Sequence, residues 1–253
     1  MMRRKGLILT YFIILSTSLA VAQSSDPTEI VKYSDDLLQG QSSSGTYRMT
    51  VKTPSWERRL ELKVYSKNKE KMLVRILSPA KESGIGTLRI KNEMWNYLPN
   101  VEKTIKIPPS MMLQPWMGSE FANDDLVKES SIVNDYIHRL AGEVILDGET
   151  CLQVELLPKP NAAVIWGKIL LSVRKQDNVP VREEYFNEAG KPIKVLYYSN
   201  VGQVSDRVVP RTWRMASQIK PGQETTIELM DDVQYNIPID DAVFSLTNLK
   251  KIQ

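Results

Sequence analysis

Apolar and polar residues alternate along most of the chain beyond residue 45. Tyr47, Met49 and Val51 alternate with polar neighbours, and Leu62 and Val64 continue the pattern in the next run. A period of two places apolar side chains on one face of a β-strand. We therefore expect a mainly β (α+β) fold with about eleven strands in antiparallel meander order. An open sheet of this length must twist, curl or close, and a curled sheet has a concave face.

Two segments depart from this alternation. Residues 26–40 begin with Asp-Pro-Thr-Glu, continue with apolar residues at helical spacing and end at Gly40, so they predict a helix. Residues 110–129 predict one or two short helices, with a cap for the second near Asn123. Helices in these places are natural covers for the concave face of a curled sheet.

The first 22 residues have the pattern of a cleaved signal peptide. A short basic stretch precedes an apolar run over residues 6–19, and Ala20-Val21-Ala22 matches the small-x-small cleavage pattern. We expect the mature chain to begin at Gln23 and residues 23–253 to form a single domain in the periplasm. A retained membrane anchor is the alternative, although the apolar run is short for a membrane span.

The basic character of the whole chain comes from this leader. The chain has 33 basic and 30 acidic residues, and the three basic residues of the leader have no acidic counterpart there, so 30 of each remain after cleavage. A balanced charge gives no broad cationic face, and nucleic acid is therefore not an expected partner. No later stretch is long and apolar enough to span a membrane.

The chain carries little catalytic or metal-binding chemistry. Cys151 is the only cysteine and His138 the only histidine, so an internal disulfide is excluded and a zinc site lacks ligands. The sequence contains no phosphate loop, dinucleotide fingerprint or nucleophile elbow. We interpret Cys151 as a buried structural residue and His138 as a surface or packing residue. We expect no cofactor, no metal ion and no enzymatic activity.

Adjacent acidic residues offer the one chemical alternative. Four aspartate pairs lie at residues 35–36, 124–125, 231–232 and 240–241. Neighbouring side chains in a strand point to opposite faces, and acids at a helix start complement the helix dipole, so we interpret these pairs as structural. Glu183 and Glu184 follow Arg182 in an expected strand, where we expect them to form cross-strand pairs.

Large apolar side chains are concentrated in one short segment. Six of them fall within eleven residues: Met111, Met112, Leu113, Trp116, Met117 and Phe121. Methionine suits surfaces that repack around varied partners. Apolar residues at helical spacing also pack into cores, so ligand contact and core packing both stay open from the pattern alone.

Several motifs in a fixed order carry a resemblance to a known family. They are W-N-Y-L-P at residues 95–99, K-T-I-K-I at 103–107, M-G-S-E-F-A-N-D-D-L at 117–126, F-N-E-A-G-K-P-I-K at 186–194 and V-P-R-T-W-R-M at 209–215. In these motifs and over the whole mature chain, the sequence resembles the bacterial outer-membrane lipoprotein-sorting family, relatives of the periplasmic carrier LolA and its acceptor LolB. The resemblance implies an unclosed half β-barrel, a curved antiparallel sheet with helices over its concave side.

The resemblance also implies a function and its partners. The family cavity holds acyl chains, so we expect a periplasmic carrier or chaperone for lipidated protein or other lipid cargo. An inner-membrane transporter would supply the cargo, an outer-membrane acceptor would receive it, and the carrier would be a monomer. One alternative is an accessory subunit of an envelope transporter complex that carries no cargo. Another is a hydrolase of envelope lipids, which only the acidic pairs motivate.

The expected hydrophobic cavity has a wall and a lid. The wall residues are Met49, Leu62, Val64, Val74, Trp95 and Tyr97, and the lid is the set of six large apolar residues from Met111 to Phe121. A one-residue error in register reverses the inward set of a strand. The wall assignment therefore depends on the register of each strand.

Overall fold

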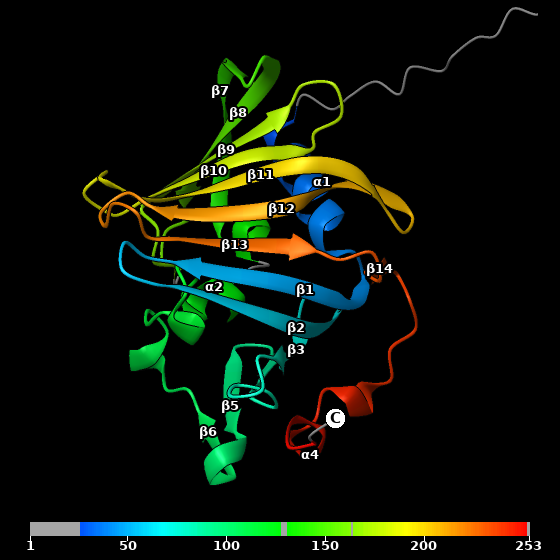
Figure 1. Cartoon of the computed structure of the whole chain (residues 1–253). Helices are drawn as coiled ribbons and strands as arrows, with labels where there is room; N and C mark the ends of the chain where they lie inside the picture. The colour runs from blue at the N-terminus through cyan, green and yellow to red at the C-terminus, as the bar shows by residue number, and fades with distance from the viewer. Residues whose placement is uncertain (1–25, 128–130, 163, 252–253) are drawn as a thin grey trace, which may run out of the picture.

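The computed structural model describes residues 26–127, 131–162 and 164–251, and most of them belong to one antiparallel sheet (Figure 1). The expected signal peptide over residues 1–22 and the cleavage site before Gln23 lie outside the described residues. Within the described part of the chain, no helix combines the length and the apolar character that crossing a membrane requires. The mainly β fold class is confirmed.

The sheet contains fourteen strands in the described part of the chain. Their bounds are β1 (Ser42–Lys52), β2 (Glu57–Lys67), β3 (Lys71–Ser78), β4 (Gly86–Ile90), β5 (Glu93–Leu98), β6 (Lys103–Lys106), β7 (Tyr136–Leu146), β8 (Glu149–Pro158), β9 (Lys168–Arg174), β10 (Pro180–Phe186), β11 (Pro192–Val204), β12 (Arg207–Ser217), β13 (Glu224–Leu229) and β14 (Gln234–Tyr235). The number exceeds the expected count of about eleven, in part because a strand as short as β14 shows no alternation in the sequence.

The order of the strands leaves the sheet open. One meander runs from β1 to β6, a second runs from β7 to β13, and the two meet where β1 pairs with β13. The register joins Tyr47 to Leu229 and Val51 to Thr225, which are far apart in the sequence. β6 and β7 are therefore the two edges of the sheet, and the segment between them crosses from one edge to the other. The unclosed sheet is confirmed, although the chain forms two meanders and not one.

Helices form where the sequence predicts them. α1 (Pro27–Gln39) begins after Asp26, whose side chain accepts a 2.8 Å hydrogen bond from the Thr28 backbone N–H. It ends at Gly40, whose φ of 63° favours glycine. Between the two edge strands lie η2 (Pro109–Met111), η3 (Trp116–Gly118), α2 (Asn123–Val127) and α3 (Ser131–Asn134). The remaining short helices are η1 (Pro99–Val101), η4 (Asp241–Val243) and α4 (Leu246–Leu249).

The two faces of the sheet bury different clusters. In β3, Val74 packs with Leu62 and Met94 on the concave side, whereas the adjacent Leu73 packs in a cluster with Leu249 of α4. Adjacent strand residues point to opposite faces. The end of the sheet formed by β3, β4 and β5 is therefore covered on both faces, and α4 lies against β4 on the outer one (Figure 1).

The lone cysteine and the lone histidine have structural contacts. Cys151 is fully buried in β8, and this burial raises the pKa of its thiol. His138 of β7 contacts the Ile132 carbonyl oxygen at 2.8 Å through Nε2 and the Thr28 Oγ1 at 3.2 Å through Nδ1. The contacts of His138 join β7 to α1 and α3, which agrees with a packing role, and the burial of Cys151 agrees with a structural role.

Candidate functional site

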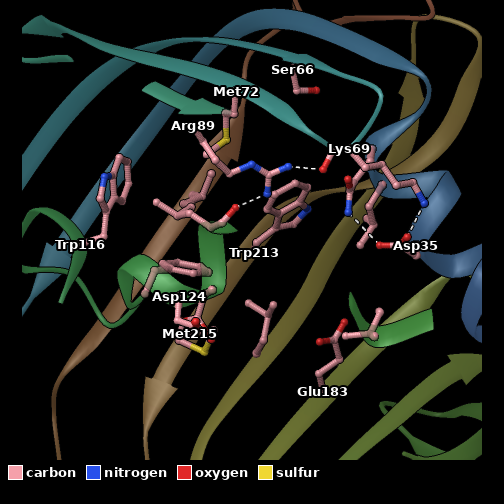
Figure 2. A pocket seen from close by; sticks show the side chains of 18 of the residues that line it. Asp35, Ser66, Lys69, Met72, Arg89, Trp116, Asp124, Glu183, Trp213 and Met215 are labelled. Carbon is pink, nitrogen blue, oxygen red and sulfur yellow. Dashed lines mark hydrogen bonds and ion pairs between the residues drawn. The ribbon is translucent and has the colours of Figure 1, made fainter. Parts of the chain in front are cut away.

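A cavity lies between the concave face of the sheet and the segments that cover it, with its lining side chains shown in Figure 2. Its volume is about 210 Å³. An apolar cavity of about 150 Å³ holds a benzene molecule, which has six carbon atoms, so this cavity has room for on the order of eight carbon atoms. The space therefore corresponds to about half of a long acyl chain.

The floor of the cavity consists of alternate residues from strands of both meanders. From β1, β2 and β3 come Tyr47, Leu62, Val64, Met72 and Val74, and from β11, β12 and β13 come Leu196, Tyr198, Trp213, Met215 and Ile227. Side chains at positions i and i+2 share a face of a strand, so each strand contributes an apolar stripe. Together the stripes form a surface onto which an apolar chain can leave water.

The segment between β6 and β7 forms part of the cover. Trp116 and Phe121 line the cavity and are only 3% and 8% exposed. The chain turns back between them, because the Trp116 backbone N–H donates a 2.7 Å hydrogen bond to the Phe121 carbonyl oxygen. Leu38 of α1 and Ile132 of α3 also line the cavity. The cover is therefore assembled from α1 and from the long connection between the two sheet edges.

The cavity brings together five of the residues that the sequence suggests as ligand contacts. Leu62, Val64 and Val74 line it from the expected wall, and Trp116 and Phe121 line it from the expected lid. These residues come from strands of the first meander and from the connection that follows it. Their role in binding stays a prediction that the shape of the cavity supports.

The methionine-rich part of the expected lid divides between core and surface. In the lid, Met112 and Met117 pack against the core cluster of the concave side without lining the cavity, and Met49 of the expected wall is fully buried in that same cluster. Met111 and Leu113 are 45% and 59% exposed. The cluster of large apolar residues therefore fills the base of the cover more than it lines the cavity.

Trp95 and Tyr97 lie on the other face of the sheet. Both pack in the cluster that contains Phe244 and Leu249, whereas Met94 packs on the concave side. Met94 therefore faces the concave side, and the prediction that Trp95 and Tyr97 face it is wrong by one residue. A one-residue error in the register of a strand gives this result.

Glu183 is a lining residue that sequence interpretation missed. It is 7% exposed and lies in the cavity wall, where the Tyr198 hydroxyl donates a 2.7 Å hydrogen bond to its Oε1 and the Tyr185 hydroxyl donates to its Oε2. Burial raises the pKa of Glu183 despite these two hydrogen bonds. The expected cross-strand pairing is confirmed for Glu183, whose partner Tyr198 lies on β11, and is wrong for Glu184, which pairs at 2.8 Å with Arg182 of the same strand. The sequence could have indicated this position, because Glu183 and Tyr185 are two residues apart in a strand and their side chains therefore lie on the same face.

Asp35 and Lys69 form a second polar contact at the cavity. The Lys69 Nζ donates to the Asp35 Oδ2 (Figure 2). It also donates, at 2.6 Å, to the Asp36 Oδ1. Burial raises the pKa of Asp35, although the hydrogen bond from Lys69 opposes this effect. The pair joins α1 to the turn between β2 and β3. The aspartate pair at residues 35–36 thus has a structural contact.

Asp125 of α2 connects the cover to the floor. Its Oδ2 accepts a hydrogen bond from the Lys194 Nζ of β11 and another, at 2.7 Å, from the Ala122 backbone N–H. Lys194 also lies over the rings of Trp166 and Tyr185, at 4.8 and 5.2 Å from their centroids. Both side chains of the ion pair are largely buried. The contact therefore ties the cover to the second meander.

Two further aspartates have contacts that organise turns. The Asp232 side chain accepts hydrogen bonds of 2.8 Å from both the backbone N–H and the hydroxyl of Thr46. Asp241 pairs with Lys67 at 2.7 Å and with Lys71 at 3.0 Å, and hydrogen bonds from these lysines lower the pKa of Asp241. These contacts agree with the structural interpretation of the acidic pairs.

Comparison with known proteins identifies relatives of this fold. A family model described as "uncharacterized protein" matches residues 68–251. The chain is similar to the crystal structure of a DUF1329 family protein from Desulfovibrio piger, with 22% identity, a TM-score of 0.80 and coverage of 88% of this chain and 97% of that one. No curated protein matches the sequence.

Two further solved structures are similar to this chain. A domain from Vibrio parahaemolyticus, described as an outer membrane lipoprotein-sorting protein, has 22% identity, a TM-score of 0.76 and coverage of 89% of this chain and 98% of that one. A LolA superfamily protein from Nitrosomonas europaea has 22% identity, a TM-score of 0.73 and coverage of 88% of this chain and 98% of that one. At this identity the similarity establishes the LolA-like fold.

Proposed function

This chain belongs to the family whose model matches residues 68–251 and has the LolA-like fold, and we propose that it is a periplasmic carrier for acyl chains. It would bind the chain of a lipidated protein or another lipid in the cavity and deliver it toward the outer membrane. The observation that carries the proposal is the apolar cavity of about 210 Å³ between the concave sheet and its cover.

The size of the cavity fits part of one acyl chain. Burial contributes about 0.8 kcal/mol per methylene group, so about eight methylenes give on the order of 6 kcal/mol. Part of this free energy offsets the loss of freedom on binding. Capture from water depends on this burial, and release then requires a partner or a movement of the cover.

The cover is built in a way that allows such a movement. Trp116 and Phe121 belong to a connection of short helices between the two sheet edges. The backbone hydrogen bonds of this connection, such as those from Trp116 to Phe121 and from Asp124 to Met112, join residues of the connection to one another. A segment outside the sheet ladder opens at lower free-energy cost than the strands of the sheet. A movement of the cover would expose the cavity while the sheet keeps its register.

The compartment and the partners belong to the same proposal. The signal-peptide pattern of residues 1–22 supports the periplasm. A carrier in that compartment would take cargo from an inner-membrane transporter and pass it to an acceptor at the outer membrane. The description of the Vibrio parahaemolyticus domain as an outer membrane lipoprotein-sorting protein supports this direction of transfer.

Titration of the purified protein with a fluorescent long-chain acyl probe tests the proposal. The carrier account expects saturable binding with one probe per protein, and expects unlabelled lipid to displace the probe. A protein that leaves the probe in water at all concentrations would contradict it.

Exposed apolar residues on an edge strand favour a second candidate, the accessory subunit without cargo. Ile137, Leu140 and Ile145 of β7 are 40%, 48% and 73% exposed. Exposed apolar residues near an unpaired strand edge suit contact with another protein. Crosslinking in cells from position 145 would distinguish the candidates, because only the second expects a membrane partner to be captured while the protein remains without lipid.

A further inference from the structure

Glu183 is the buried carboxyl of the cavity wall whose hydrogen-bond partners are both uncharged. It projects from β10 into the cavity among the residues that Figure 2 labels. The Tyr198 hydroxyl donates to Oε1 at 2.7 Å and the Tyr185 hydroxyl donates to Oε2. Within the described residues, Glu183 has no ion pair with a lysine or arginine. A carboxylate oxygen has two lone pairs, so each oxygen retains capacity to accept a further hydrogen bond.

The lysines near the cavity are already engaged with acids. Lys69 pairs with Asp35, and Lys194 pairs with Asp125. Lys71 of the lining pairs with Asp241 at 3.0 Å. An anionic head group would have to compete with these carboxylates for each cation.

The arginine of the lining is engaged with the backbone. Arg89 is 3% exposed, and its guanidinium donates to the carbonyl oxygens of Leu126 and Lys69 (Figure 2). These hydrogen bonds join β4 to the cover and to the β2–β3 turn. The Arg89 guanidinium therefore has a structural role that a bound anion would disturb.

Taken with the apolar floor, these contacts define the head group that fits. We propose that Glu183 is a specificity residue that accepts a hydrogen bond from an uncharged donor, a hydroxyl or an amide N–H, at the head of a single acyl chain. This inference rests on the proposed carrier function. A free carboxylate at the same place would lie beside the Glu183 carboxyl with no cation to separate them, and like charges at short distance oppose each other.

Competition binding with matched ligands tests the inference. The fluorescent acyl probe is displaced at about pH 8 by dodecanol, dodecanamide or dodecanoate, which share a chain and differ in the head group. We expect the alcohol and the amide to bind at least about tenfold more tightly than the carboxylate, because only the two neutral head groups can donate a hydrogen bond to the Glu183 carboxylate. The two neutral ligands separate hydroxyl recognition from amide recognition.

Three variants connect the preference to this residue. Glu183→Leu removes the acceptor and is expected to reduce the preference to within about threefold. Glu183→Gln keeps the shape and an acceptor and adds a donor, so it is expected to retain the alcohol and to bind dodecanoate more tightly than the unaltered protein does. Glu184→Leu is the matched control, because Glu184 lies on the other face of β10 and pairs with Arg182. It is expected to leave the preference unchanged.

The outcomes separate the inference from the function on which it rests. Tight binding of dodecanoate by the unaltered protein, or an unchanged preference in both Glu183 variants, would overturn the inference and leave the carrier function standing. Failure of the probe itself to bind would overturn both.

Discussion

The indole Nε1 of Trp116 donates a 3.1 Å hydrogen bond to the Oγ1 of Thr87 at the base of the cover. Both residues are buried, and the Thr87 hydroxyl in turn donates at 2.8 Å to the Asn96 Oδ1 of β5. This chain of hydrogen bonds fixes the cover to the first meander, whereas the Asp125–Lys194 pair fixes it to the second. The cover therefore spans the open side of the sheet as a strap attached to both halves.

Removing the first attachment is expected to destabilise the protein. Thr87→Val leaves the Trp116 indole N–H without its acceptor in a buried place, and an unsatisfied buried donor costs about 1–3 kcal/mol. Urea unfolding measures the change. Trp56→Phe is the control, since Trp56 is 47% exposed and surface changes usually stay within about 0.5 kcal/mol. Equal stability of the Thr87 variant and the unaltered protein would contradict the attachment.

Removing the second attachment is expected to open the cover. Lys194→Met leaves the Asp125 carboxyl largely buried without its cation, and breaking one side of a buried ion pair costs about 3–5 kcal/mol. We expect faster release of a bound acyl probe, measured by stopped-flow dilution, and faster proteolysis within residues 122–127.

A second substitution, at Asp125, tests whether the effect of Lys194→Met comes from the broken ion pair. Asp125→Asn in the Lys194→Met background removes the isolated charge and should recover part of the stability, as a double-mutant cycle would quantify. Lys191→Met in the exposed turn after β10 is the matched lysine control. If the control and Lys194→Met release the probe at the same rate, the ion pair does not hold the cover.

Filling the cavity is expected to abolish binding while the fold survives. Ile227 of β13 lines the floor and is only partly buried, so Ile227→Trp places an indole in the space of the acyl chain. Glu228→Trp adds the same bulk on the other face of the strand, where the Glu228 side chain is 41% exposed. Probe titration should show loss of binding for the first variant alone. Full binding by Ile227→Trp would place the ligand elsewhere.

The pKa of Glu183 predicts how stability changes with pH. Burial raises this pKa above its ordinary value of 4.5, so the unfolded chain loses the proton at lower pH than the folded protein does. Stability from this group is therefore complete below about pH 4.5 and falls as the pH rises toward the folded pKa. Glu183→Gln has no titrating carboxyl at this position and does not lose this stability. Urea unfolding from about pH 4 to pH 8 should therefore show that the free energy of unfolding of the variant, relative to that of the unaltered protein, increases with pH. Parallel stability curves would contradict the burial of a titrating carboxyl.

Period-two alternation located most strands and the correct inward set in β2 and β3. Leu62, Val64 and Val74 were predictable because the outer neighbours of these residues include charged side chains such as Lys63 and Arg75. In β5 the alternation did not indicate which residues face the cavity, because Trp95 and Tyr97 on the outer face are also apolar and are covered by the C-terminal segment. Where both faces of a strand are buried, apolar residues mark neither face as the inner one.

The polar lining depends on contacts between distant residues. Lys194 and Asp125 are 69 positions apart, and their pairing follows from the crossing of the connection between the sheet edges. The connection crosses the sheet because β1 pairs with β13. This pairing joins distant parts of the chain and cannot be predicted from a local sequence pattern. The position of Glu183 on the inner face, beside Tyr185 of the same strand, could be predicted from the sequence, but its contact with Tyr198 required the register of β10 on β11.

Native mass spectrometry of the protein purified from the periplasm tests the central claim most directly. The account predicts a population whose mass exceeds that of the polypeptide by one lipid, released as a molecule with an acyl chain when the protein is unfolded. Protein found only at the polypeptide mass, and still at that mass after incubation with dodecanol, would contradict the claim that the cavity is a binding site for an acyl chain.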